Sequence, residues 1–166
     1  MAGGKVLPLK RRREGKTNYK KRLSLLKSGK PRVVVRISNN YITLQLVEFN
    51  GTDKTKFSYT SKKLSEFGWD YSKKNLPAAY LTGLVFGFIC KKNKIEEGIF
   101  DIGVKRVTKG NRLFSVLKGC LDSGLKIPCS TDIFPSESRI RGEHISEDIP
   151  KKFDEVKKNI LNKYGK

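Results

Sequence analysis

The chain has 166 residues, 37% of them hydrophobic, and carries 36 Lys and Arg against 16 Asp and Glu, for a net charge of +20. This length allows one domain with a substantial core, and the hydrophobic share is too high for a disordered chain, so a folded domain with basic extensions is expected. Such a charge makes nucleic acid the natural partner, because each contact with phosphate releases condensed counterions, and it leaves a membrane surface as the weaker alternative.

The excess positive charge is concentrated at the N-terminus. Thirteen basic side chains and a single acid, Glu14, lie within residues 1–36, so this segment alone carries +12. Residues 1–16 show no apolar period, and we expect them to form an extended arm. Thr17 is a suitable N-cap for a short helix over residues 18–28.

The clearest sign of secondary structure is a set of three strands. Their β-branched composition or their alternation of apolar and polar residues predicts strands over residues 33–38, 41–49 and 54–60. Asn39 and Asn40 link the first two strands, and because asparagine tolerates positive φ we expect a type I′ turn there. The result is a three-stranded antiparallel meander. One face is apolar, and the other, with Arg36 and Gln45, is expected to face solvent or RNA.

Two helices are predicted to cover the buried face of this sheet. Helical spacing of apolar residues predicts the first helix from about residue 75, with Pro77 in its first turn, and the second over residues 111–123. Gly83 and Gly87 form a small-xxx-small pair in the first helix. We expect this pair to allow the helix to pack closely on the sheet.

Shorter elements fill the rest of the chain. Short strands are predicted at residues 99–102 and 125–129, a basic loop at 105–110, an irregular loop at 130–145 and a last helix at 146–164. The predicted fold class is α/β, a two-layer mixed sheet made of a three-strand antiparallel meander followed by α-β-α-β, with helices on one face, plus a basic N-terminal arm and a C-terminal helix. The predicted parts are the arm and short helix at residues 1–30, an α/β core domain at 31–130, and a loop with the C-terminal helix at 131–166.

Candidate catalytic residues are few. His144 is the only histidine, which excludes a metal site built on two histidines and leaves little for a Ser-His-Asp or Cys-His arrangement. The sequence holds neither GxGxxG nor GxxxxGKS/T, so neither nucleotide-binding motif is present. The topology also suits nucleases that hold two Mg²⁺ ions, but Asp101 stands alone where several carboxylates are needed. We therefore expect no enzymatic activity, no cofactor and no metal.

The cysteines and the apolar segments indicate a soluble intracellular protein. Cys90, Cys120 and Cys129 are odd in number and lack CxxC spacing, which is typical of buried free thiols in a reducing cytoplasm. No apolar segment follows the basic N-terminus, as one would in a signal peptide. The most apolar stretch, residues 76–90, is too short to span a bilayer.

Polar and aromatic side chains are interleaved with the basic residues of the arm. Arginines can bind two phosphate oxygens and stack on bases, and Tyr19 can stack on an unpaired base. Thr17 and Asn18 can donate to phosphate or 2′-OH groups. No helix-turn-helix or zinc-finger spacing is present, so folded RNA suits the chain better than duplex DNA. A general architectural nucleic-acid binder remains the alternative, and a metal-dependent nuclease is a third hypothesis.

Seven blocks of the sequence resemble one known family. They are RRREGKTNYKKRL at residues 11–23, SGKPRVVVRISNNYITLQLVEF at 28–49, GW at 68–69, NLPAAYLTG at 75–83, IEEGIFDIGVKR at 95–106, GNRLFSVLKGCLDSGLKIP at 110–128 and PSESRIRGEHI at 135–145. In this order they resemble the universal 5S-rRNA-binding protein family of the large ribosomal subunit, large-subunit protein eighteen in bacterial naming and five in eukaryotic naming. The last block indicates the archaeal and eukaryotic branch. The extended basic tail of longer eukaryotic members has no counterpart here.

The resemblance implies a structural constituent of the large ribosomal subunit in the cytoplasm. It implies binding of 5S rRNA and its attachment to 23S rRNA in the central protuberance, next to neighbouring large-subunit ribosomal proteins that include the other 5S-binding protein. Neither a membrane nor DNA is among the implied partners. By matching position, the resemblance places RNA contacts on the arm, on the first strand-turn-strand and on the loop before the second helix. These residues are Arg11, Arg12, Arg13, Thr17, Tyr19, Arg22, Arg32, Arg36, Ser38, Asn39, Asn40, Tyr41, Arg106, Lys109, Asn111 and Arg112.

Overall fold

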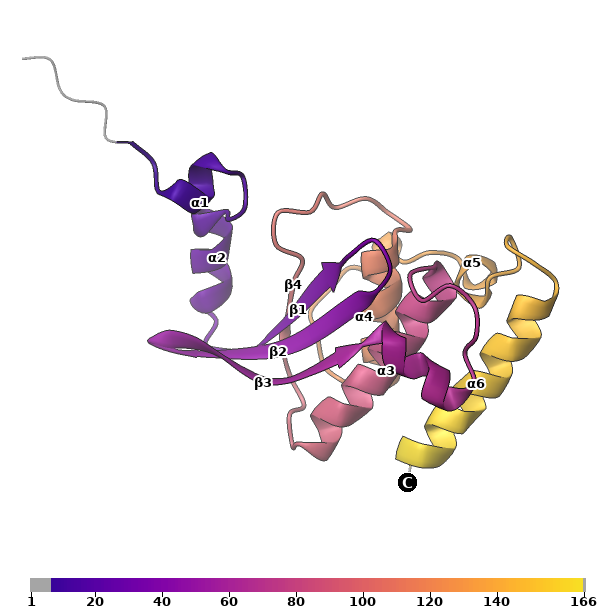
Figure 1. Ribbon diagram of the computed structural model, residues 1–166. Coiled ribbons are helices and arrows are strands. Elements are labelled where there is room, and N and C mark those ends of the chain that lie inside the picture. Colours follow the sequence, from indigo (N-terminus) through magenta and orange to yellow (C-terminus); the bar gives the residue numbers. More distant parts are fainter. Residues whose placement is uncertain (1–6, 166) are drawn as a thin grey trace, which may run out of the picture.

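The centre of the protein is a four-stranded mixed sheet, seen in a computed structural model that describes residues 7–165 (Figure 1). The strands are β1 Arg32–Ile37, β2 Ile42–Asn50, β3 Thr52–Thr60 and β4 Ile99–Asp101, in the order β3-β2-β1-β4. β1, β2 and β3 pair in antiparallel fashion, which confirms the predicted meander, and β4 runs parallel to β1. A parallel pair needs a long crossover connection, and the helical segment after β3 provides it on one face of the sheet.

Helices make up most of the remaining described chain. They are α1 Lys10–Arg13, α2 Tyr19–Leu26, the 3-10 helix η1 Ser61–Phe67, α3 Leu76–Lys92, α4 Arg112–Asp122, the 3-10 helix η2 Thr131–Ile133, α5 Glu137–Arg141 and α6 Asp148–Tyr164. α3 lies between the sheet, α4 and α6, whereas α1 and α2 project from the opposite end of the molecule (Figure 1). The α/β class with helices on one face is therefore confirmed.

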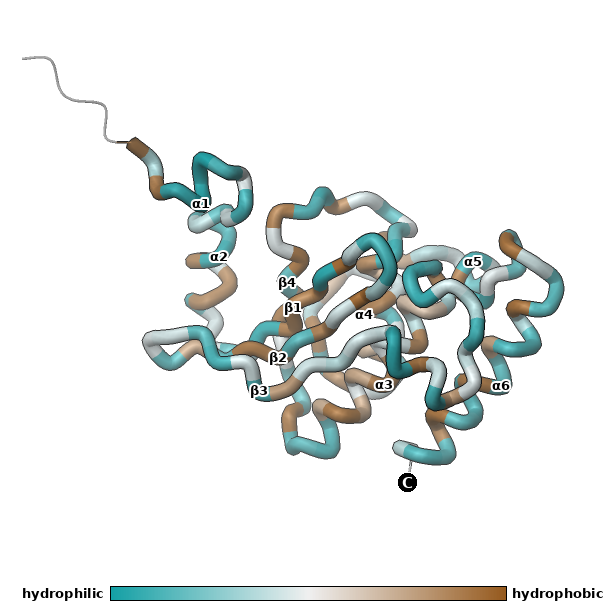
Figure 2. Tube along the Cα trace, in the orientation of Figure 1, coloured by the Kyte–Doolittle hydropathy of each residue, from teal (hydrophilic) through white to brown (hydrophobic). Residues whose placement is uncertain are grey.

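The buried face of the sheet follows the alternation of its strands. Val33, Val35, Ile42, Leu44 and Leu46 are all buried and belong to the main hydrophobic core. Hydrophobic residues gather where the helices meet the sheet, whereas α1 and the turn after it are mostly hydrophilic (Figure 2). Removing this apolar surface from water is the main force that holds the two layers together.

α3 and α4 approach each other closely because glycines line their contact. A Cβ atom at Gly83 would lie 2.1 Å from the carbonyl oxygen of Val116, and one at Gly119 would lie 2.2 Å from that of Tyr80. Gly87 faces the C-terminal end of α4 in the same way. The glycines of α3 thus face α4 and not the sheet, so this part of the prediction is wrong. α3 is buried on nearly all sides, so its sequence pattern does not distinguish the face toward α4 from the face toward the sheet.

The N-terminal arm is more ordered than its sequence indicated. The short helix α1 forms where extended chain was predicted, and α2 is capped by Asn18 rather than by Thr17. The Asn18 side chain accepts a hydrogen bond from the backbone N–H of Lys21 at 3.0 Å. The Thr17 hydroxyl instead accepts from Nε of Arg11 at 2.9 Å. Residues 1–6 of the predicted arm lie outside the described residues.

The turn between β1 and β2 also differs from the prediction. Neither Asn39 nor Asn40 has a positive φ, so the turn is not type I′. Ser38 closes it instead: its N–H donates to the carbonyl of Tyr41 at 2.9 Å, and its hydroxyl accepts from the N–H of Tyr41 at 3.0 Å. The Ser38 hydroxyl thus takes the place of a backbone carbonyl as the acceptor for the N–H of Tyr41. The regular ladder of β1 and β2 therefore ends at Ile37, and the turn needs no residue with a positive φ.

Two predictions for the second half of the chain also need correction. Residues 125–129 do not form a strand, because only Lys126 makes an isolated bridge, to Glu97, and Pro128 lacks the N–H that would extend it. Among the described residues the sheet therefore has four strands, not five. Residues 130–145, predicted as irregular, include η2 and α5.

All three cysteines are free, as predicted. Cys90 and Cys120 are buried, and burial raises the pKa of the Cys90 thiol to about 12 and also raises that of Cys120. Cys129 is exposed, contrary to the expectation of burial; partial desolvation raises its pKa, while Lys118 acts in the opposite direction. Thiols with raised pKa values are poor nucleophiles at neutral pH.

Candidate nucleic-acid interface

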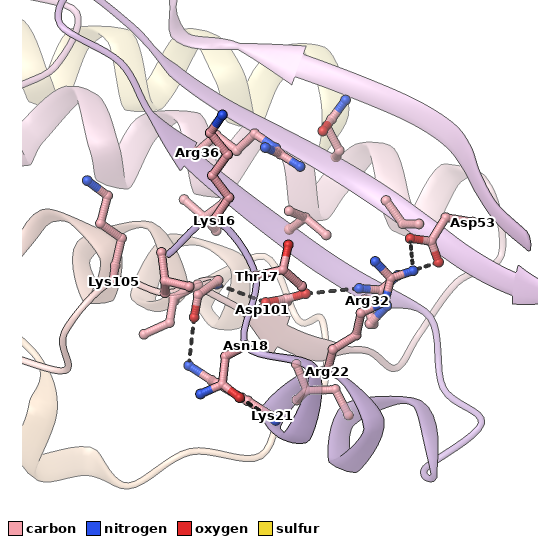
Figure 3. A pocket seen from close by; sticks show the side chains of 18 of the residues that line it. Lys16, Thr17, Asn18, Lys21, Arg22, Arg32, Arg36, Asp53, Asp101 and Lys105 are labelled. Carbon is pink, nitrogen blue, oxygen red and sulfur yellow. Dashed lines mark hydrogen bonds and ion pairs between the residues drawn. The ribbon is translucent and has the colours of Figure 1, made fainter. Parts of the chain in front are cut away.

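The polar face of the sheet and helix α2 enclose a groove of about 500 Å³, which we call the sheet groove (Figure 3). One wall is α2 with the turn before it, the floor is the polar side of β1 and β2, and the other wall is the segment that follows β4. Its charged lining residues are Lys16, Lys21, Arg22, Arg32, Arg36, Lys105, Asp53 and Asp101. The groove thus brings together segments that are far apart in the sequence.

Arg32 lies in the floor of the sheet groove between two carboxylates. It is only 4% exposed, and it donates from Nη1 to Asp101 at 3.0 Å and from Nη2 to Asp53 at 2.7 Å. The other oxygen of Asp101 accepts from the N–H of Gly103 at 2.9 Å. A buried charge requires such partners, and this network ties β1 to β4 and to the β2–β3 hairpin. The RNA contact of Arg32 stays a prediction, and its burial favours a structural role.

Helix α2 is placed against the sheet by polar contacts. Nη2 of Arg22 donates to the second oxygen of Asp53 at 2.6 Å, and Nζ of Lys21 donates to the carbonyl of Gly103 at 3.1 Å. No residue of α2 is buried, so packing alone does not fix its orientation. Asp53 therefore links two arginines, one in the floor of the groove and one in its wall.

Of the remaining cations that line the sheet groove, Lys16 forms an ion pair with Glu14 at 2.8 Å, whereas two others are open to solvent. Arg36 and Lys105 are exposed, and neither has a carboxylate partner within 4 Å among residues 7–165 (Figure 3). The arginines Arg11, Arg12 and Arg13 of α1 are exposed as well. Because both acids of the groove are already neutralised by arginines, an approaching anion meets mainly positive charge here.

The β1–β2 turn and the loop before α4 follow the C-terminal ends of β1 and β4. Because these two strands are parallel, both segments begin at the same end of the sheet. In the turn Ser38, Asn39 and Asn40 are exposed, and in the loop Arg106 and Lys109 are exposed. Amide and hydroxyl groups can bond base edges, ribose and phosphate, and the basic side chains can bind phosphate. The predicted contact residues of these two segments are therefore accessible from one side.

The remaining predicted site residues have more local surroundings. Tyr19 is 37% exposed on the first turn of α2, and Tyr41 is half-buried beside the β1–β2 turn. Asn111 is the N-cap of α4, and Arg112 donates from Nη1 to the carbonyl of Lys74 at 3.2 Å. Asn111 and Arg112 do not line the sheet groove; they line a separate pocket near α5.

The sheet groove includes four residues that the sequence predicted and several that it did not. The predicted ones are Thr17, Arg22, Arg32 and Arg36. Lys16, Lys21 and Lys105 line the groove but were not predicted as site residues. Each lies in a run with several basic residues, and the sequence alone does not show which of them face the groove. The ion pairs of Asp53 and Asp101 with arginines were not predicted either. The sequence does offer one indication of them, because isolated acids in so basic a chain are expected to lie near basic side chains.

The described structure brings basic, amide and hydroxyl groups together around the sheet groove. Within residues 7–165 no group of three or more His, Cys, Asp and Glu side chains is placed to hold a metal ion. In the same part of the chain, no helix combines the length and the apolar composition needed to cross a membrane. Basic, amide and hydroxyl groups around a hollow in the surface suit the binding of a polyanion.

The sequence matches known proteins along most of its length. Residues 6–97 and 88–130 match the sequence model of a family described as ribosomal large subunit proteins 60S L5 and 50S L18. The large ribosomal subunit protein uL18 of Korarchaeum cryptofilum is 52% identical over 146 residues, which are 87% of this chain and 75% of that protein. The protein of the same name from Methanococcoides burtonii is 45% identical over 163 residues, or 94% of each chain.

Proposed function

The chain belongs to the family of ribosomal large subunit proteins that includes 50S L18, and we propose that it binds 5S rRNA and attaches it to 23S rRNA in the central protuberance. Members of this family are rRNA-binding constituents of the subunit and not enzymes. These matches, both to archaeal proteins, confirm the predicted family and its archaeal and eukaryotic branch. Neighbouring large-subunit proteins, including the other 5S-binding protein, are the protein partners that this proposal implies.

The open cations around the sheet groove support the proposal most strongly. The arginines of α1, together with Arg36 and Lys105, are exposed, while the nearby acids Asp53 and Asp101 are bound by arginines of the same chain. Phosphates would therefore find unneutralised positive charge on a surface whose floor is a rigid sheet. A rigid floor also favours a folded RNA of matching shape over any polyanion.

The test of this function is binding to 5S rRNA against an unrelated folded RNA of equal length, across a salt titration. A preference for 5S rRNA that persists as salt rises is expected, because shape and base contacts add to the salt-dependent phosphate contacts. Equal affinities that fall together with salt would contradict the proposal. That result would favour a general nucleic-acid binder.

Changing Arg11, Arg12 and Arg13 together to glutamine is expected to weaken binding to every RNA tested. If each arginine contacts one phosphate, the slope of log affinity against log salt falls by about 2–3, since each contact contributes about 0.7–0.9. The matched control changes three exposed lysines, Lys62, Lys63 and Lys158, which removes the same charge elsewhere. An arginine variant with the same salt slope as the wild-type protein would show that α1 does not contact RNA.

Asp53→Asn is expected to lower the affinity for 5S rRNA by about fivefold, equivalent to roughly 1 kcal/mol. The change removes a negative charge beside the RNA, so charge alone predicts tighter binding. It also weakens the contact with Arg22 that orients α2, together with the contact between Asp53 and Arg32 in the floor of the groove, and a misplaced arm loses contacts that require a fixed geometry. Glu48→Gln, which removes a partly exposed acid from β2, is the control. Tighter binding by Asp53→Asn would contradict an orienting role.

A further inference from the structure

We propose that the pocket beside α5 binds a backbone phosphate of an unpaired nucleotide, an inference that rests on the proposed RNA-binding function. The pocket has a volume of about 410 Å³, and we call it the α5 pocket. Its basic lining residues are Lys74, Arg112, Arg139 and His144. It shares no lining residue with the sheet groove, so it is a second and separate place on the molecule.

The starts of α3 and α4 form two walls of the α5 pocket and are fixed to each other. Arg112 donates from Nη1 to the carbonyl of Lys74 at 3.2 Å, which holds the guanidinium over the start of α3. Deeper in the protein, the buried hydroxyl of Ser115 donates to the carbonyl of Leu76 at 2.9 Å. These two bonds keep the basic groups of both segments at one place on the surface.

The third wall is the segment of α5 and the turn after it, which packs directly on the first turn of α3. Ile140 is buried in the core, between the pocket residues Arg139 and His144 in sequence. Gly142 has a φ of +87°, and a Cβ atom there would lie 2.8 Å from Cγ of Pro77 and 2.6 Å from Cγ2 of Ile149. Only a glycine fits so close an approach, and the approach brings Arg139 and His144 beside the start of α3.

The charge of the α5 pocket is positive and unbalanced. No Asp or Glu lines it, and within residues 7–165 neither Lys74 nor Arg139 has a hydrogen-bonded or ion-paired carboxylate. The nearby Arg141 differs, because it forms an ion pair with Asp154 on α6. Cations held together without an acid repel one another, and a bound anion relieves that repulsion.

The side chains, and not the helix ends, carry this assignment. Asn75 and Asn111 also line the pocket, but each already caps its own helix: Asn75 accepts from the N–H of Ala78 at 2.9 Å, and Asn111 from that of Leu113 at 2.8 Å. Phosphate binding is therefore assigned to Arg112 and Arg139, whose planar guanidinium groups can each donate two hydrogen bonds to one phosphate.

The dimensions and the rim of the pocket favour an unpaired nucleotide over a free phosphate or a duplex. Its volume of about 410 Å³ is many times the roughly 10–15 Å³ that a cavity needs to hold one water molecule, so a phosphate leaves room for the sugar or base attached to it. His144 is exposed, and Ile145 beside it is 46% exposed. Imidazole rings stack on bases and apolar side chains pack against them, but only bases that are not already paired and stacked are free to reach them.

The experiment compares binding of the full chain and its variants to 5S rRNA across a salt titration. Arg112→Gln with Arg139→Gln is expected to reduce affinity about tenfold and to lower the salt slope by roughly 1.4–1.8, the contribution of two phosphate contacts. Lys62→Gln with Lys63→Gln removes the same charge from the exposed surface of η1 and serves as the control. Equal effects of the two double variants would overturn the proposal.

Arg139→Gln alone keeps the test decisive if the double variant fails to fold. The Arg139 side chain makes no hydrogen bond or ion pair within residues 7–165, so its loss leaves the fold intact. It is expected to weaken binding to a hairpin RNA with an unpaired loop several-fold, and to leave binding to a duplex RNA of equal length unchanged. Unchanged binding of the hairpin, or equal weakening of both RNAs, overturns the assignment.

The two hypotheses fail in different ways. A wild-type protein without preference for 5S rRNA contradicts the proposed function, whatever the variants do. A wild-type protein that prefers 5S rRNA, together with an Arg139→Gln variant that binds it as tightly, leaves the proposed function standing and overturns the α5 pocket as an RNA site.

Discussion

Replacing Gly83 by alanine is expected to destabilise the protein by about 3 kcal/mol or more. The added Cβ would lie 2.1 Å from the carbonyl oxygen of Val116 and 2.9 Å from its carbonyl carbon. These are backbone atoms of α4, so no side-chain rotation removes the clash and the two helices must separate. The higher helix propensity of alanine, about 1 kcal/mol, offsets only part of this. Denaturant unfolding of the two proteins measures the difference.

Gly87→Ala is the matched control, because its clash is with a side chain. The added Cβ would lie 1.8 Å from Oγ of Ser123, an atom that a second substitution can remove. We expect Gly87→Ala to destabilise less than Gly83→Ala does, and Ser123→Ala to restore part of the loss. A Gly83→Ala variant as stable as the wild-type protein would show that α3 and α4 can move apart at little cost.

The elements with a strong local pattern could be predicted from the sequence. Alternation along β2 reproduces the observed burial of Ile42, Leu44 and Leu46, because a strand with one buried face must alternate. The amphipathic spacing of α4 and its capping residue Asn111 also suffice to place that helix. In these elements, local preference and tertiary burial favour the same conformation.

The wrong predictions concern choices that local residue preference leaves open, because they depend on contacts with other segments of the chain. Thr17 and Asn18 are both good helix caps, but Asn18 caps α2, whereas the Thr17 hydroxyl accepts from the Arg11 side chain six residues earlier. Residues 125–129 are apolar enough for a strand, but a strand also needs a neighbour with free hydrogen-bonding groups, and only Lys126 finds one. Neither contact follows from residue preference or periodicity alone.

The same limit applies to the candidate site. Arg32 and Arg36 lie four residues apart on one strand and point to the same side of the sheet, so the sequence gives no reason to separate them. What separates them is the neighbouring chain. Arg32 lies beside β4 and the β2–β3 hairpin, which supply Asp101 and Asp53, whereas Arg36, nearer the end of β1, has no ion-paired acid among residues 7–165.

Arg32→Met is therefore expected to destabilise the fold by about 3–5 kcal/mol. Methionine matches the apolar stem of arginine but lacks its charged guanidinium group, so the change leaves the buried Asp101 without its ion-pair partner. Adding Asp101→Asn should recover much of that stability, because it removes the carboxylate left uncompensated. Thermal or denaturant unfolding of the single and double variants measures both changes.

Arg36→Met is the control on the same strand, and it is expected to have the opposite profile. Its guanidinium is exposed and unpaired among the described residues, so the free energy of unfolding should change by no more than about 0.5 kcal/mol. Its affinity for RNA should fall, because a cation open to phosphate is lost. Two arginines on one face of one strand would then serve different purposes, Arg32 for the fold and Arg36 for the RNA. If Arg32→Met instead left stability unchanged and weakened RNA binding as Arg36→Met does, both would be RNA contacts, and the two carboxylates would have to release Arg32 when RNA binds.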